Sequence, residues 1–443
     1  MRQAILLVIA TPLLAQDSIS LREAVQLALR ENKAIAGVNA AARASTARID
    51  QARSGWLPKL NYSESIVRSD NPVFVFSSLL TQHQFGVENF NIGPLNRPDA
   101  MNNFQSLLSF DQPLYDAGQT PNAVKSAELA QQMTIEDKRR TEMQAIAGAV
   151  RAYYGAVLAG ESLKTAEQSM RSAEADLKRA ESVRAAGMST DVDVLSIRVH
   201  LASVTEQRIK RAAELEVSRS ALNDALGLPL DTRHILTSAL ARLDLPDVEL
   251  ASLEVDASST RPESRASHLK ADLAKTQLDS ARSAFLPQVT FHAAFEADRQ
   301  QFINKGGANW LASIGLRWNL FNGNSDKAKI EESRHWLERA HADEQRVDSA
   351  VRLEVRRAWA DLRAAEQRIE VAKAAVAEGD ESLRITQNRY EAGMSNVTDL
   401  LRNETAVLES RTRYLAAVHD QRIAATMLEL AAGRLSPDSE VLN

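Results

Sequence analysis

The chain has 443 residues, of which 44% are hydrophobic and 25% are charged, and its net charge is -5. Acidic and basic side chains are mixed along the chain, so no basic surface indicates a nucleic-acid partner. The absence of cysteine excludes a disulfide framework, a thiol nucleophile and a lipid-modified amino-terminal cysteine.

Residues 1–15 have the pattern of a secretory signal peptide: Arg2, an apolar run, and the small residue Ala15 before polar sequence. A buried first helix is the alternative, but the run is too short to span a bilayer. No later stretch approaches the ~18 apolar residues that a transmembrane helix needs. If the protein crosses a membrane, we expect it to use strands.

Two amphipathic helices are predicted next. Ser20, with a glutamate three residues later, is a capping box that begins the first helix, which breaks near Asn32. The second helix covers about 34–56 and ends before Pro58, because proline cannot continue a helix. The same pattern returns 229 residues later, over 261–287.

After each of these prolines the apolar period changes from 3.6 to 2, which predicts strands. The predicted strand pairs are 59–68 with 104–114, and 288–297 with 309–320. Their length of about ten residues, with aromatic residues at both ends of the apolar faces, is typical of tilted transmembrane strands. The alternative is a pair of soluble hairpins packed on a core, but no helix pattern is left over to cover the apolar face.

The connection 69–103 is much longer than its counterpart around 304–308, and we expect it to be an extracellular loop. Its apolar run Val73-Phe74-Val75-Phe76 is compatible with packing over a pore mouth or with ordering the loop.

Two very long helical hairpins follow the strand pairs, at 119–227 and 323–433. Each arm before its turn has roughly 65 residues and would be about 100 Å long. Apolar residues recur at alternating steps of three and four, the seam of a left-handed coiled coil. The seams match at a constant spacing of 206 residues: Leu163, Ala166, Met170, Ala173, Leu177 and Ala180, then Ile369, Ala372, Val376, Gly379, Leu383 and Thr386.

One unit has therefore been duplicated within one elongated fold. Short helices are expected at 235–245 and 250–255, in a middle segment beside the bundle. The predicted order is a signal peptide (1–15), a first repeat (16–227), the middle segment (228–260), a second repeat (261–434) and a polar tail (435–443).

The predicted fold class is mainly α, with a coiled-coil helical barrel and a transmembrane β-barrel to which each chain gives four strands. An open sheet edge in lipid leaves backbone groups unpaired at several kcal/mol each, so closure requires other copies. Two chains would supply about eight strands, the size of the smallest known membrane barrels, and three chains would supply about twelve.

Short motifs recur in order in the two halves. They are Leu57-Pro58 before a strand, Tyr115-Asp116-Ala117-Gly118 and Phe321-Asn322-Gly323 after one, Arg261-Pro262-Glu263 at the start of the second half, and Arg389-Tyr390-Glu391-Ala392-Gly393 at the second turn. Together they resemble the TolC-like outer-membrane efflux channel family, the outer membrane factors of tripartite export systems.

The resemblance implies a homotrimer in the bacterial outer membrane, with twelve strands in the lipid and twelve helices extending into the periplasm. Its implied partners are a periplasmic adaptor protein and an inner-membrane transporter of RND or ABC type. The expected function is an exit duct for small molecules such as drugs, toxic compounds or metal ions. The alternatives are a duct for type I protein secretion and, in another class, a soluble coiled-coil scaffold or periplasmic adaptor.

The resemblance also implies a pore constriction at the helix tips, where Asp399 matches a ring of carboxylates and Tyr390 a tyrosine that ties neighbouring tips. Two positions depart from the family pattern: Arg402 stands where a second acid is expected, and Ser395 where an arginine is expected. Arg402 is therefore a candidate partner for Asp399, and strong cation selectivity does not follow.

Asp193 is the corresponding gate candidate in the first half, and both aspartates also fit a helix cap. The two glycines of the turns fit a left-handed backbone whatever the function. The implied adaptor-contact residues are those of the two turns: Ala186, Gly187, Met188, Ala392, Gly393 and Met394.

No hydrolase, zinc-protease, phosphate-loop or dinucleotide-binding motif is present, so we expect no catalytic residue and no cofactor. Glu332 and Glu338 each precede a histidine by three residues. Carboxylate-bridged metal sites take such pairs from two facing helices, whereas these lie on one, so we expect a solvated face and no metal.

Overall fold

The structure is a computed structural model that describes residues 18–187, 190–244, 246, 248–303 and 306–443. The predicted signal peptide, 1–15, and the turn residue Met188 lie outside these described residues. The chain divides into two compact units, which we call the helical unit (Met1–Ala40, Ile135–Ala266 and Gln345–Asn443) and the sheet unit (Ala41–Thr134 and Ser267–Glu344). Among the described residues, no helix is both long enough and apolar enough to cross a membrane.

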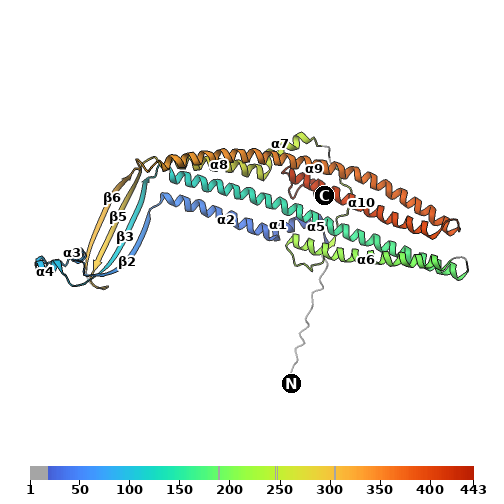
Figure 1. Cartoon of the computed structure of the whole chain (residues 1–443), viewed down its shortest axis with the longest axis horizontal. Helices are drawn as coiled ribbons and strands as arrows, with labels where there is room; N and C mark the ends of the chain where they lie inside the picture. Colours follow the sequence, from blue (N-terminus) through green and yellow to red (C-terminus); the bar gives the residue numbers. More distant parts are fainter. Residues whose placement is uncertain (1–17, 188–189, 245, 247, 304–305) are drawn as a thin grey trace, which may run out of the picture. The chain divides into compact units, whose positions relative to one another are not determined.

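Helices dominate the chain, and two of them are several times the usual length (Figure 1). The α-helices are α1 (Leu21–Glu31), α2 (Lys33–Arg53), α3 (Pro72–Thr81), α4 (Ile92–Asn96), α5 (Gln119–Ala185), α6 (Asp191–Leu226), α7 (Leu250–Thr260), α8 (Pro262–Ser283), α9 (Ser325–Glu391) and α10 (Val397–Ala431). The strands are β1 (Ser18–Ile19), β2 (Lys59–Ser69), β3 (Met101–Tyr115), β4 (Ile235–Leu236), β5 (Gln288–Arg299) and β6 (Gly307–Arg317).

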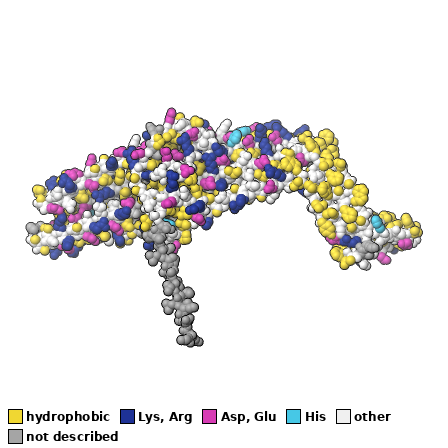
Figure 2. Space-filling view, turned by 180° about the vertical axis from the view of Figure 1, so that it is seen from behind, with side chains coloured by type: hydrophobic (Ala, Val, Ile, Leu, Met, Phe, Trp, Pro, Cys, Tyr) yellow, Lys and Arg dark blue, Asp and Glu magenta, His cyan; other side chains and the backbone are white. Residues whose placement is uncertain are grey.

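The sheet unit contains an antiparallel four-stranded sheet in the order β2-β3-β5-β6. Its register places Tyr62, Leu108, Phe295 and Trp310 in one row across the four strands. All four side chains are exposed, from 41% for Leu108 to 80% for Trp310, and Figure 2 shows hydrophobic side chains gathered in this part of the chain. The apolar alternation predicted from the sequence therefore builds an uncovered apolar face.

The last strand ends earlier than the alternation predicts. β6 stops at Arg317, and Trp318 beyond it donates its indole N–H to the carbonyl of Phe285, at 3.0 Å. Beyond Arg317 the backbone no longer pairs with β5, although apolar and polar side chains still alternate. Alternation shows which face a side chain lies on, and it does not by itself require strand pairing.

The long connection between β2 and β3 folds into helices. Asn71 accepts the N–H groups of Val73 and Phe74 and so begins α3. Gln82, only 2% exposed, follows α3 and donates to the carbonyl of Asn102 and to Asn103 Oδ1, at 3.1 and 2.8 Å. Asn71 thus begins the helix in this loop, and Gln82 joins the loop to the start of β3.

The main core of the helical unit lies among α1, α5, α6 and α10. The predicted capping box begins α1, with Ser20 and Glu23 bonded to each other's backbone N–H groups. In the first seam Ala166, Ala173 and Ala180 are buried, as the three-four spacing predicts.

The expected helix over 235–245 is wrong. Ile235 and Leu236 form β4, which pairs in parallel with β1, and the described residues that follow, up to Asp244, contain no helix. The N–H of Thr237 continues the pairing by donating to the carbonyl of Ile19, at 3.1 Å. The backbone groups of Ile235 and Leu236 bond to a strand more than 200 residues away in the sequence. A local apolar pattern cannot predict such a distant partner. The helix expected at 250–255 is present and is longer, as α7.

Tyr153→Phe is expected to lower the free energy of unfolding by about 1–2 kcal/mol, because the half-buried N–H of Ser238 loses its acceptor and the carbonyl of Ile19 loses a donor. The Tyr153 hydroxyl, fully buried, donates to the carbonyl of Ile19 at 3.0 Å and accepts the N–H of Ser238 at 2.9 Å. Urea unfolding followed by circular dichroism measures the change. Tyr414→Phe is the control, since the Tyr414 hydroxyl has no hydrogen bond to any residue that the structure describes; an equal loss in both variants would contradict the prediction.

Candidate functional site at the hairpin turns

Each long hairpin turns on a glycine in the left-handed region, where other residues are strained. Gly187 has a φ of 78° and Gly393 a φ of 74°. The described residues of the two turns, Ala186, Gly187, Ala392, Gly393 and Met394, are all exposed.

Asp193 caps its own helix. Thr190 precedes α6 and accepts the N–H of Asp193 at 3.2 Å, while the Asp193 carboxylate accepts the Thr190 N–H at 3.1 Å and its hydroxyl at 2.8 Å. This is a complete capping box. The structure therefore gives Asp193 a local role at the start of α6.

Asp399 is placed differently. The cap of α10 is Asn396, whose side chain accepts the N–H of Asp399 at 2.8 Å. Ser395 Oγ donates to the half-buried Asp399 carboxylate over a long 3.5 Å. Arg402 is exposed and forms no ion pair with Asp399 in the described part of the chain, so the pairing considered from the sequence is absent there. The Asp399 carboxylate therefore takes a smaller part in capping its helix than the Asp193 carboxylate does.

Tyr390 lies where the two hairpins meet. It packs against a small core made by Ala180, Val194, Ile197 and Val397, which come from α5, α6 and α10. Burial raises the pKa of the Tyr390 hydroxyl, and the negative charges of Asp193 and Asp176 raise it further. The structure thus brings Tyr390 and Asp193 together, on neighbouring hairpins.

Sequence reasoning missed a polar cluster near Tyr390, made by Asp176, His200 and Glu404. Asp176 on α5 is 6% exposed, and His200 on α6 lies 3.2 Å from Glu404 on α10, measured from Nε2 to Oε2. Nearby, Arg179 of α5 forms an ion pair with Glu391 of α9. A signal existed, because Asp176 falls three residues after Ala173 on the buried side of the first seam. Its partners, on two other helices, gave no such signal.

A second missed residue joins the two arms of the second hairpin. Asn403 on α10 donates to Thr386 Oγ1 on α9 at 2.9 Å and to the Asp399 carbonyl at 3.1 Å, and it accepts the hydroxyl of Ser382 at 3.0 Å. Asn403 is half-buried, and its bonds to Thr386 and Ser382 link α10 to α9.

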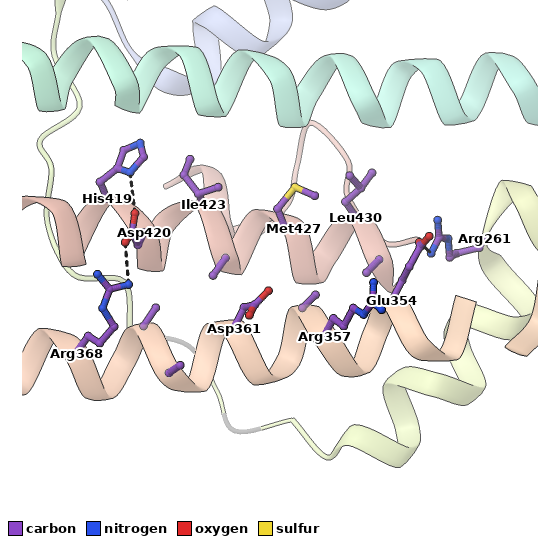
Figure 3. A pocket seen from close by; sticks show the side chains of 15 residues that line it. Arg261, Glu354, Arg357, Asp361, Arg368, His419, Asp420, Ile423, Met427 and Leu430 are labelled. Carbon is purple, nitrogen blue, oxygen red and sulfur yellow. Dashed lines mark hydrogen bonds and ion pairs between the residues drawn. The ribbon is translucent and has the colours of Figure 1, made fainter. Parts of the chain in front are cut away.

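Farther from the turns, a groove of about 530 Å³ lies along α9 and α10 (Figure 3). Its lining includes the apolar side chains of Ile423, Met427 and Leu430 from α10. It also includes charged side chains: Asp420 binds Arg368 at 2.9 Å, and Glu354 pairs with Arg261. Apolar side chains bordered by ion pairs are typical of a surface that another helix covers.

The histidines considered for a metal site remain on one exposed face of α9. His335 bonds Glu338 at 3.0 Å, and His341 bonds Glu344 at 3.3 Å. Among the described residues, no group of three His, Cys, Asp or Glu side chains is placed to hold a metal ion.

Comparison with known proteins identifies the class. The model of the outer membrane efflux protein family matches residues 24–228 and 253–434. Protein CyaE of Bordetella pertussis is 26% identical over 425 residues, which cover 95% of this chain and 85% of the relative. Outer membrane efflux protein BepC of Brucella suis is 22% identical over 383 residues, which cover 86% of this chain and 83% of the relative.

Among solved structures, the CmeC outer membrane channel of Campylobacter jejuni has a TM-score of 0.79 at 16% identity, over 95% of this chain and 87% of that chain. This likeness shows the fold, and the family match covers both repeats. The chain belongs to the outer membrane efflux protein family. It is an outer-membrane exit duct of a tripartite export system, located in the outer membrane and extending into the periplasm.

Proposed function

We propose that three copies of this chain form one duct for small molecules, with a gate at the hairpin turns. The sheets of three copies close a barrel in the outer membrane, and the helices continue it as a tunnel through the periplasm. Support comes from the uncovered apolar face of the sheet and from its two edges, β2 and β6, each of which has one neighbouring strand within the described chain.

The observation that carries the proposal is an apolar stripe on α6. Its large members are exposed by 56 to 72%. Its positions follow one another at steps of three or four residues, as in a coiled-coil seam, except between Ala202 and Ile209, where Glu206 occupies the intermediate position. The stripe consists of Val192, Leu195, Val199, Ala202, Ile209, Ala213 and Val217. A second copy of the chain would cover it, as it would the groove along α9 and α10. Such head-to-tail contacts close a ring when the rotation between copies allows it.

The gate residues of the proposal are Asp399, Asp193, Tyr390 and Arg402. Three copies would bring three Asp399 carboxylates to the narrow end, where like charges repel and packing must hold them. The exposed turns would contact a periplasmic adaptor, which links the duct to an inner-membrane transporter of RND or ABC type. The duct itself is passive, and the transporter supplies the energy.

Planar bilayer recording tests the gate. Protein extracted from outer membranes is expected to show a small, stable conductance, which rises several-fold or changes ion selectivity in Asp399→Ala because the carboxylate ring is lost. The control is Glu409→Ala, which removes an exposed carboxylate of α10 that pairs with Arg413. An unchanged conductance in Asp399→Ala would mean that Asp399 acts only at the start of α10 and not in the gate. The absence of conductance from every intact preparation would contradict the proposed duct.

A further inference from the structure

Three titratable side chains meet between the two hairpins of one chain. Asp176 comes from α5, His200 from α6 and Glu404 from α10. Asp176 is 6% exposed, and the side chains of His200 and Glu404 are 13% and 10% exposed. The described part of the chain therefore shields all three side chains from water.

The carboxyl groups of Asp176 and Glu404 are near enough to interact electrostatically. Burial raises the pKa of Asp176 to about 7, and the neighbouring Glu404 adds to the effect through a hydrogen bond and its charge. Two neighbouring carboxylates in a poorly solvated site repel each other strongly, which favours a state in which one carboxyl group holds a proton. His200 Nε2 lies 3.2 Å from Glu404 Oε2, and neither atom has a hydrogen-bond partner among the described residues, so this contact is an ion pair whenever His200 is protonated.

Other charged groups face the cluster from the surrounding helices. Arg179 on α5 favours the ionised form of Asp176, as does His200 on α6, but Arg179 is also paired with Glu391 of α9. Tyr390 on α9 senses the charge of Asp176. The described part of α10 contributes Glu404 alone to these interactions. The positive groups therefore weaken the repulsion between the carboxyl groups without removing it.

We propose that Asp176, His200 and Glu404 form a proton-dependent latch that holds the α5–α6 hairpin against the α9–α10 hairpin. When the shared proton is present, an O–H···O bond joins α5 to α10, and the Glu404–His200 pair joins α10 to α6. When the proton leaves, two adjacent carboxylates push the hairpins apart. The latch acts within one chain, so it does not depend on trimer formation or on the proposed gate.

The direction of the pH effect follows from linkage. Asp176 has a higher pKa when the hairpins are packed than when they are apart and the carboxyl group is in water. The packed state therefore binds the proton more tightly, and its advantage is lost as the pH rises through about 7. Mild acidification is expected to tighten the hairpin contact, and alkaline conditions to loosen it.

Spin-label distance measurements test the latch. The chain has no cysteine, so Ser182→Cys on α5 and Asn388→Cys on α9, both at exposed positions, introduce the only labelling sites. Labelled chain is diluted into an excess of unlabelled chain, so each signal reports the distance within one chain. Between about pH 6 and about pH 8.5, the ratio of packed to separated hairpins is expected to fall about tenfold.

Variants distinguish the latch from a general effect of pH. In Glu404→Gln the second carboxyl group is absent, and the distance distribution is expected to stay narrow at both pH values. Asp176→Asn is expected to behave in the same way and serves if Glu404→Gln does not fold. Glu409→Gln, which changes an exposed carboxylate on the same helix, is expected to keep the wild-type response. A wild-type distribution that is identical at both pH values, or a full response in both latch variants, would overturn the proposal.

Discussion

The double variant Val199→Glu, Ile209→Glu is expected to remain a single chain in detergent and to form no duct. Both side chains belong to the apolar stripe of α6 and are 72% and 60% exposed. Covering the stripe with a second copy would bury two unpaired carboxylates in each contact. The cost is more than about 3 kcal/mol per contact, which removes a large part of the free energy available to hold the copies together.

Light scattering after size-exclusion chromatography measures this effect as the mass of the protein part of the detergent complex. Wild type is expected at the mass of three chains and the double variant at the mass of one. Gln207→Glu is the matched control, because position 207 is exposed on α6 but does not belong to the stripe; it is expected to keep the wild-type mass. A trimeric double variant would show that the stripe does not form the contact between copies.

Gly227→Ala is expected to lower the free energy of unfolding by about 3–4 kcal/mol, a large effect for one methyl group. Gly227 ends α6 with a φ of 77°, where a side chain costs about 1–2 kcal/mol. A Cβ would also lie 2.5 Å from the carbonyl oxygen of Glu31, at the junction of α1 and α2. Backbone cannot yield as a flexible side chain can, so α1 would have to move away from the core.

Gly187→Ala separates these two causes. Gly187 has nearly the same φ, 78°, but apart from Gly187 and its chain neighbours no atom of the described chain lies within 4 Å of the added Cβ, so only the backbone cost of about 1–2 kcal/mol is expected. Urea unfolding of both variants, followed by circular dichroism under the same conditions, measures the difference. If the two losses are equal, the contact with Glu31 has no energetic importance.

The same contact recurs in the second half, which ties the duplication to packing. Gly433, with a φ of 71°, faces Thr260 and Arg261 at the junction of α7 and α8. Thr260 Oγ1 donates to the carbonyl of Ala432 at 3.1 Å, much as the side chain of Asn32 donates to Ala225 in the first half. The glycines match at a spacing of 206 residues and the junctions at 229. Both repeats thus dock a short helix onto the end of a long one.

The elements that sequence reasoning predicted well are those with a strong local period. The three-four seam predicted long helices, and the three alanines of the first seam are buried; the alternation after Pro58 and Pro287 predicted strands with one apolar face. Such periods follow from backbone geometry alone. They need no knowledge of the partner surface, so duplication, helices and strands were all readable from one sequence.

Other features depended on residues far apart in the chain. Ile235 and Leu236 look like part of an apolar helix, yet they pair with the first described residues of the chain. Asp193 and Asp399 occupy matching positions after their turns, but a complete capping box engages only Asp193, whose carboxylate accepts the backbone N–H of its cap residue Thr190.

By itself, the sequence determined the duplicated architecture, the four strands, the two glycine turns and membership of a family of outer-membrane ducts. Only the tertiary structure decided which polar groups share a site. Asp176, His200 and Glu404 are ordinary members of three amphipathic helices until packing places them together. The reason is physical: a helical period fixes which face of a helix is buried, whereas the rotation and register between helices fix which side chains on those faces meet.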